Sequence, residues 1–192
     1  MKILLPLVLA FAATAGVADA SHYSSQAGSR LTFTTSFEGE SFTGRFEKFE
    51  AAIRFDPKNL ADSRFDVRIP LASARTDNDE RDEALHGPDF FDAAGKPEAR
   101  YEATRVVKLK DGRYRADGTL TLRGIRKPVP LVFSVSAGPT PILVGEATVD
   151  RLAFGVGKGE FADLELIPGK VTVRTRLVLA VRAPPKVPEA VK

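Results

Sequence analysis

Two alternating apolar stretches separated by a short turn constrain the fold more than any other feature of the chain. The apolar positions are Leu120 and Leu122 before the turn and Val129, Leu131, Phe133 and Val135 after it. A period of two is that of a β-sheet with one dry face. Gly124 is free to adopt the positive φ of a turn, and Pro128 fits only an edge, a bulge or the start of a strand. Residues 117–135 therefore predict a hairpin that covers a core or an apolar ligand.

The same alternation recurs along most of the chain and predicts eight antiparallel strands. Their ranges are 29–36, 43–55, 63–71, 99–109, 113–123, 129–135, 142–151 and 170–182. In the second strand Phe46 is out of step by one, and a bulge near Lys48 would restore the register and bend the strand. Eight strands closed on themselves leave no edges and enclose a lumen for side chains or one small ligand. We predict an all-β, eight-stranded antiparallel barrel, with an open sandwich as the alternative.

A charged segment interrupts the strands and predicts a short helical insert over residues 77–86. Asp77 or Asn78 is the expected N-cap, and Gly87 followed by Pro88 ends the helix. Its carboxylates are predicted to form a solvated face: Asp77, Asp79, Glu80, Asp82 and Glu83. The adjacent aromatics Phe90 and Phe91 follow in a loop. They either gate a mouth of the barrel or plug one of its ends.

The ends of the chain are predicted to lie outside the fold. Residues 1–20 combine a positive start, an apolar run over 3–17 and a small-residue site at 18–20, which is typical of a cleavable signal peptide. The mature protein is therefore expected in the periplasm. Residues 21–28 form a polar lead-in within a single domain over 21–182, and the proline-rich residues 183–192 form a flexible tail. No later stretch is long enough to span a membrane.

Composition argues against several functional classes. The net charge is only +3 with both signs mixed, which does not favour nucleic-acid binding. No cysteine is present, which excludes disulfides, thiol catalysis and thiolate metal sites. The two histidines, His22 and His86, are too far apart in sequence to indicate a metal site. Asp82 lies one helical turn before His86, but no nucleophile motif accompanies the pair. Lys158 lies in a glycine-rich loop without the Ser or Thr of a phosphate loop. We predict a protein that is not an enzyme, with no catalytic residues and no metal.

Five short motifs in consistent order resemble the YceI-like family of exported polyisoprenoid-binding proteins. They are Gly44 with residues 46–57; Arg81, Asp82 and Leu85 with residues 89–92; Pro97, Tyr101 and Thr104; residues 118–124 with Pro128 and Val129; and Val149, Arg151, Phe154 and Gly155. One departure is Ala27-Gly28-Ser29, where the family often carries an Asp and a His-Ser pair, so any role of that histidine is absent. The resemblance implies a lipocalin-like barrel that holds a long isoprenoid, such as a quinone or polyprenyl lipid, often as a homodimer.

We predict that the following residues bind the lipid: Phe33, Phe49, Ile53, Phe65, Val67, Ile69, Phe90, Phe91, Leu120, Leu122, Phe133, Val135, Val149, Phe154, Val173 and Leu177. The same side chains would equally fill a solid core. Arg151 either meets a polar head group at the barrel rim or pairs with Asp150 or Glu146.

The sequence as a whole favours a non-catalytic periplasmic carrier of an amphiphilic lipid. Its ligand is then an isoprenoid or another long-chain lipid, held without a catalytic cofactor. Two alternatives remain open: a stress-related protein-interaction module that needs no lipid, and a binder of fatty acids or their amides.

Overall fold

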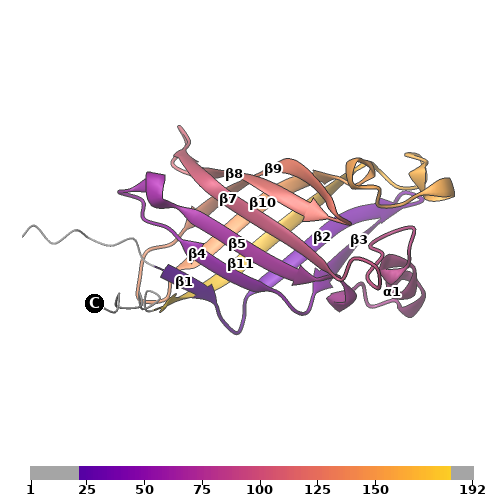
Figure 1. Ribbon diagram of the computed structural model, residues 1–192, viewed down its shortest axis with the longest axis horizontal. Coiled ribbons are helices and arrows are strands. Elements are labelled where there is room, and N and C mark those ends of the chain that lie inside the picture. Colours follow the sequence, from indigo (N-terminus) through magenta and orange to yellow (C-terminus); the bar gives the residue numbers. More distant parts are fainter. Residues whose placement is uncertain (1–21, 183–192) are drawn as a thin grey trace, which may run out of the picture.

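Antiparallel pairing joins almost all of the strands into one continuous wall in the computed structural model, which describes residues 22–182 (Figure 1). The strands are β1 (His22–Ser25), β2 (Arg30–Phe37), β3 (Glu40–Phe46), β4 (Glu50–Arg54), β5 (Arg64–Pro70), β6 (Ala74–Arg75), β7 (Glu98–Lys108), β8 (Tyr114–Leu122), β9 (Ile125–Val135), β10 (Ile142–Asp150) and β11 (Lys170–Arg182). The helix α1 spans Asp79–His86, and 3₁₀ turns occupy Leu60–Asp62, Leu71–Ser73, Leu152–Phe154 and Gly159–Ala162. The predicted signal peptide and proline-rich tail lie outside the described residues.

The wall closes through β11, which pairs with two successive strands. The order runs β1–β4–β5–β7–β8–β9–β10–β11, and β11 then pairs with β1 through Tyr23 and Val181 and with β2 through Phe33 and Val173. β1 with β2, and β3 with β4, are each two parts of one wall strand, so the barrel has eight strands. The predicted closed barrel is confirmed, and the open sandwich is not what forms. The two-residue strand β6 pairs with β3 beside this circle.

Two local features of the wall differ from the alternation pattern. The predicted lead-in is wrong for residues 22–25, which form β1 between β4 and β11; a strand of four residues is too short to show a period, although Tyr23 packs against the core. The predicted irregularity near Lys48 is confirmed as a break at residues 47–49. There the Glu47 amide donates to the Ser73 carbonyl at 3.0 Å.

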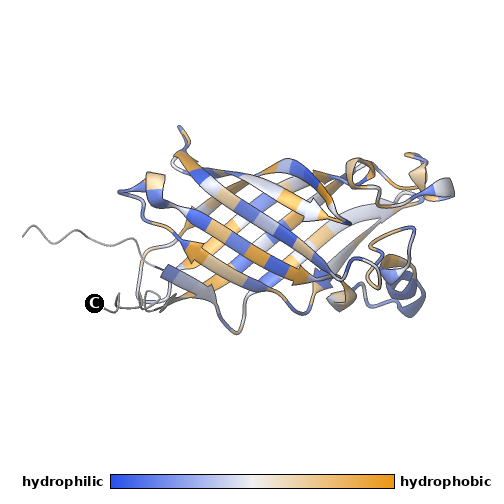
Figure 2. Cartoon of the chain, in the orientation of Figure 1, coloured by the Kyte–Doolittle hydropathy of each residue, from blue (hydrophilic) through white to orange (hydrophobic). Residues whose placement is uncertain are grey.

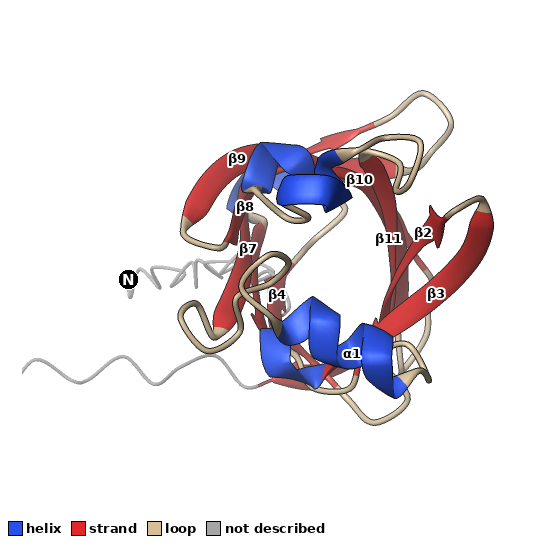
Figure 3. Ribbon diagram, turned by 90° about the vertical axis from the view of Figure 1, so that its right-hand side faces the viewer, coloured by secondary structure: helices blue, strands red, loops and turns tan. Residues whose placement is uncertain are grey.

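The helical insert forms almost as predicted and covers one end of the barrel, which we call the mouth (Figure 3). Asn78 is the N-cap, and its side chain accepts a hydrogen bond from the Arg81 amide at 2.8 Å. The prediction of a solvated face is wrong for Asp82. This carboxylate is buried, and one of its oxygens accepts from both the amide and the hydroxyl of Thr76, each at 2.7 Å.

Aromatic rings fill the end of the barrel opposite the mouth. Phe133 is 1% exposed and lies 5.3 Å from Phe65, 5.5 Å from Phe55 and 5.6 Å from Tyr114, measured between ring centroids. We call these four rings the aromatic plug. Along the strands of the wall, hydrophilic and hydrophobic residues alternate (Figure 2). Open space remains on the side of the plug nearer the mouth.

A glycine makes room for a wall aromatic on the neighbouring strand. Gly44 pairs with Phe33 across β2 and β3, and a Cβ added at Gly44 would come within 2.1 Å of the Phe33 ring. We expect Gly44→Ala to lower the free energy of unfolding by about 1–3 kcal/mol, because the ring must leave its position. Urea unfolding measures this. Gly169→Ala is the control, since its Cβ would meet only the exposed Leu164 side chain at 3.2 Å. Equal losses in the two variants would contradict the expectation.

Candidate ligand-binding cavity

An apolar cavity of about 500 Å³ lies between the aromatic plug and the mouth. Its volume falls in the range of roughly 300–1,000 Å³ that small-molecule sites usually have. Every wall strand except β1 and the short β6 contributes inward-facing side chains to it. The rim is completed by Asn78, Glu80, Arg81 and Ala84 at α1 and by Phe161 and Ile167. The mouth end of the barrel is seen along its axis in Figure 3.

Thirteen of the sixteen residues predicted to bind the lipid lie on the wall of this cavity. They are Phe33, Phe49, Ile53, Phe65, Val67, Ile69, Phe90, Phe91, Leu120, Leu122, Val149, Val173 and Leu177. The other three lie elsewhere: Phe133 belongs to the plug, Val135 packs against the same cluster, and Phe154 is buried in the mouth-side core. Ligand contact by any of them stays a prediction.

Sequence reasoning missed a group of aromatic wall residues on the β2–β3 hairpin. Phe37, Phe42 and Phe46 all line the cavity. Phe42, Gly44 and Phe46 are spaced two residues apart and so share one face of β3. The break at residues 47–49 puts them out of step with the apolar residues of β4. Tyr101 and Leu31 were in phase in their strands and also line the cavity.

Two loops meet over part of the mouth and hold aromatic rings there. The first loop contains Asp89 and Phe90, and the second contains Gly157, Lys158 and Phe161. The Asp89 carbonyl accepts hydrogen bonds from the amides of Gly157 at 2.7 Å and Lys158 at 3.2 Å. The Phe90 and Phe161 rings lie 4.9 Å apart. Phe91 instead points inward, 6.3 Å from Phe33 and 6.0 Å from Phe46. Phe90 and Phe91 thus lie at the mouth, and the opposite end is plugged by other rings.

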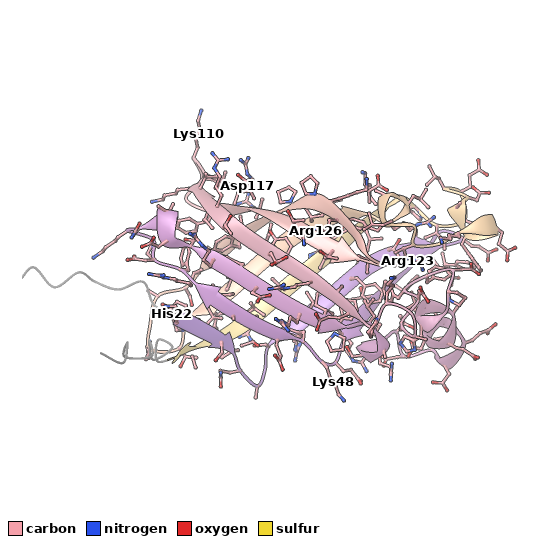
Figure 4. The ribbon with its side chains drawn as sticks, viewed as in Figure 1. His22, Lys48, Lys110, Asp117, Arg123 and Arg126 are labelled. Atoms are coloured by element: carbon pink, nitrogen blue, oxygen red, sulfur yellow. The ribbon has the colours of Figure 1, made fainter. Side chains whose placement is uncertain are left out.

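Arg123 ties the end of the β8–β9 hairpin to the first of these loops. Its guanidinium donates to the Pro88 carbonyl at 2.8 Å and to the Phe90 carbonyl (Figure 4). Its backbone adopts a positive φ of 53°, a conformation that is uncommon outside glycine. The hairpin predicted first from the sequence therefore also fixes the mouth.

Arg151 holds the second loop from inside. Its side chain is almost fully buried and donates to the carbonyls of Val156, Gly157, Ile167 and Pro168 at 2.6–3.4 Å. Burial lowers its pKa from the ordinary value. The predicted ion pair with Asp150 or Glu146 is wrong, because Asp150 pairs with Lys170 and Glu146 with Arg174.

Polar groups on the cavity wall are few. The Tyr101 hydroxyl donates to the Ala116 carbonyl at 3.3 Å, and burial raises the pKa of this phenol. The Thr35 hydroxyl is buried without a hydrogen-bond partner in the described part of the chain. The cavity therefore offers a ligand mainly apolar contact and a few polar groups near the rim.

Asp82 and His86, the acid–histidine pair of the helix, each contact other groups in the structure. The Asp82 carboxylate is bound to Thr76, while the His86 ring nitrogen lies 3.0 Å from the Ala74 carbonyl. Residues 22–182 contain no group of three or more His, Cys, Asp or Glu side chains placed to hold a metal. Within the same residues, no helix has the length and apolar character needed to cross a membrane.

Comparison with known proteins gives this barrel a family. Residues 23–179 match the family described as the YceI-like domain. The chain belongs to the YceI-like family. A UPF0312 protein of Vibrio campbellii is 33% identical to this YceI-like chain over 147 residues, which cover 71% of this chain and 78% of that protein. A UPF0312 protein of Vibrio cholerae is 29% identical over 177 residues, covering 86% and 94%.

Solved structures share the fold of this YceI-like barrel. Burkholderia cenocepacia BcnA superposes with a TM-score of 0.76 at 27% identity, over 81% of this chain and 98% of BcnA. A protein described as a polyisoprenoid binding domain from Saccharophagus degradans, implicated in plant cell wall breakdown, gives a TM-score of 0.65 at 16% identity, over 85% and 99% of the two chains. The latter likeness is one of fold.

Proposed function

We propose that this YceI-like barrel is a non-catalytic carrier that holds a long-chain isoprenoid, such as a quinone or a polyprenyl lipid, in its cavity. The observation that carries the proposal is the apolar cavity of about 500 Å³, which the plug closes at one end and which reaches the surface at the mouth. The polyisoprenoid binding described for the Saccharophagus degradans protein of the same fold supports this choice of ligand.

Burial of the chain alone supplies enough free energy for such a ligand. An isoprene unit has about five carbons, and about 0.8 kcal/mol per buried CH₂ gives a few kcal/mol gross for each unit. Association and ordering of a flexible chain offset about 4–15 kcal/mol of the total. Several buried units therefore suffice without a charged anchor, which agrees with a wall made mainly of Phe, Leu, Val and Ile.

The proposed place of action is the periplasm. This part of the proposal comes from the signal-like residues 1–20, which lie outside the described structure. In that compartment the protein stores an apolar molecule or moves it through water. Asp82 and Arg151 near the cavity are engaged in structural hydrogen bonds, which supports binding rather than catalysis.

Native mass spectrometry of the protein isolated from its own host, followed by organic extraction, tests the proposal. We expect one lipid per barrel with fragments spaced by isoprene units. A fatty acid or its amide would keep the carrier and change its cargo. A bare mass that stays bare after incubation with quinones and polyprenols would overturn the proposal and favour a protein-interaction module.

A further inference from the structure

Strand pairing in the barrel wall is interrupted between β1–β2 and β3–β4. Ser24 pairs with Ala52, and the next pair between the same two wall strands is Thr32 with Arg45. Between these pairs, residues 25–31 form no strand ladder with residues 46–51, although both segments pair with other strands. In the described structure one hydrogen bond is recorded across the gap, from the Ala51 amide to the Ser25 hydroxyl at 3.2 Å. The break in β3–β4 and the turn between β1 and β2 therefore leave an interval in the wall.

A polar surface groove of about 690 Å³ lies outside this interval. Its lining comprises Ser25, Gln26, Ala27, Gly28, Ser29, Glu47, Lys48, Phe49, Glu50, Arg68, Pro70 and Glu98. Phe49 is the one residue that lines both this groove and the internal cavity. Its side chain packs against buried residues on the plug side and on the mouth side of the barrel. The Phe49 side chain is thus shared by the lumen and the groove.

The ring of Phe49 is partly exposed, whereas backbone hydrogen bonds hold the mouth loops together. Ser73 holds the backbone of the two residues before Phe49. Its carbonyl accepts a hydrogen bond from the Glu47 amide, and its hydroxyl donates one to the Lys48 carbonyl at 3.1 Å. Lys48 points away from the barrel at this break (Figure 4). The ring is only half-buried, and side-chain rotation is fast where packing permits it. Wider opening of the mouth instead requires the bonds to the Asp89 carbonyl to break.

We propose that Phe49 gates a second opening through the barrel wall, by which one end of the bound lipid reaches the groove. This inference rests on the proposed lipid-binding function. The groove offers hydroxyl, amide and charged groups of both signs to the polar end of an amphiphile, while the cavity holds its apolar chain. A lipid with an opening at each end of its path can enter or leave without passing the mouth loops.

The test uses transfer of dansyl-labelled farnesol from the protein to phosphatidylcholine vesicles, followed by dansyl fluorescence. We expect Phe49→Ala to speed transfer at least fivefold with one probe still bound per barrel. Val144→Ala is the control: Val144 is exposed on β10 and lines neither the cavity nor the groove, so this variant should change the rate less than twofold.

A second arm closes the groove without touching the core. Since the chain has no cysteine, Ala27→Cys carries a single bulky maleimide label at an exposed position in the groove. We expect this label to slow transfer at least fivefold, and the same label on Ala162→Cys, exposed at the mouth, serves for comparison. The proposal stands only if Phe49→Ala speeds transfer and the Ala27 label slows it; otherwise it is overturned. Failure of the unaltered protein to bind the probe would overturn the proposed function itself.

Discussion

Replacement of Ala147 by Trp is expected to prevent lipid loading while leaving the barrel folded. Ala147 lies on β10 opposite Val173, and its small side chain lines the cavity. An indole at this position occupies open space that the ligand needs. We expect the affinity for an isoprenoid to fall at least tenfold, which is about 1.4 kcal/mol. Titration with a short-tailed quinone measures the loss.

The neighbouring residue provides a matched control for this variant. Thr148 is exposed on the outer face of the same strand, so Thr148→Trp should bind the quinone normally. Because the chain has no tryptophan, the new indole also reports its own surroundings. Its fluorescence should be blue-shifted in Ala147→Trp and not in Thr148→Trp. Equal quinone affinity in the two folded variants would contradict the assignment of the cavity.

Arg151→Met is expected to cause the largest loss of stability among the substitutions considered. The four carbonyl groups that Arg151 bonds would lose their donor, and a buried acceptor left without a partner costs about 1–3 kcal/mol. Since loop rearrangement and water recover part of this, we expect the free energy of unfolding to fall by about 2–4 kcal/mol. Urea unfolding measures the loss.

Hydrogen exchange shows whether that loss is local to the mouth. The amides of Gly157 and Lys158, which donate to the Asp89 carbonyl, should exchange faster in Arg151→Met than in the unaltered protein. Arg176→Met is the control, because Arg176 is exposed and makes one long hydrogen bond at 3.4 Å. Its effect should stay within about 0.5 kcal/mol. Unchanged protection at Gly157 would contradict the role given to Arg151.

The alternation of apolar residues was sufficient to predict the closed barrel, but not its two irregular strands. The period-two pattern is long in β8, β9 and β11, where each inward residue repeats the signal, whereas a register shift between Ala103 and Val106 interrupts it in β7. It fails in β1 because four residues, with polar neighbours around Tyr23, do not establish a period. It also fails for Phe46, because the break at residues 47–49 separates two stretches that are each in phase.

The sequence could not predict which inward-facing residues line the cavity and which fill the plug, for a different reason. Leu122 and Phe133 face inward from adjacent strands and follow the same pattern, yet Leu122 lines the cavity and Phe133 fills the plug. Open volume depends on how many rings converge at one height of the barrel, and alternation carries no information on height. The partners of Arg151 are backbone carbonyls, which leave no trace in residue identity.

The pairing of β1 with β11 has a consequence for the order of events in folding. The first and last described strands complete the wall between them, so residues about 150 positions apart must meet before the circle is closed. Contacts of such long range slow folding, and until they form, strand edges remain open to other chains. During synthesis β11 emerges after the other wall strands, so nascent chains remain prone to association until β11 has paired.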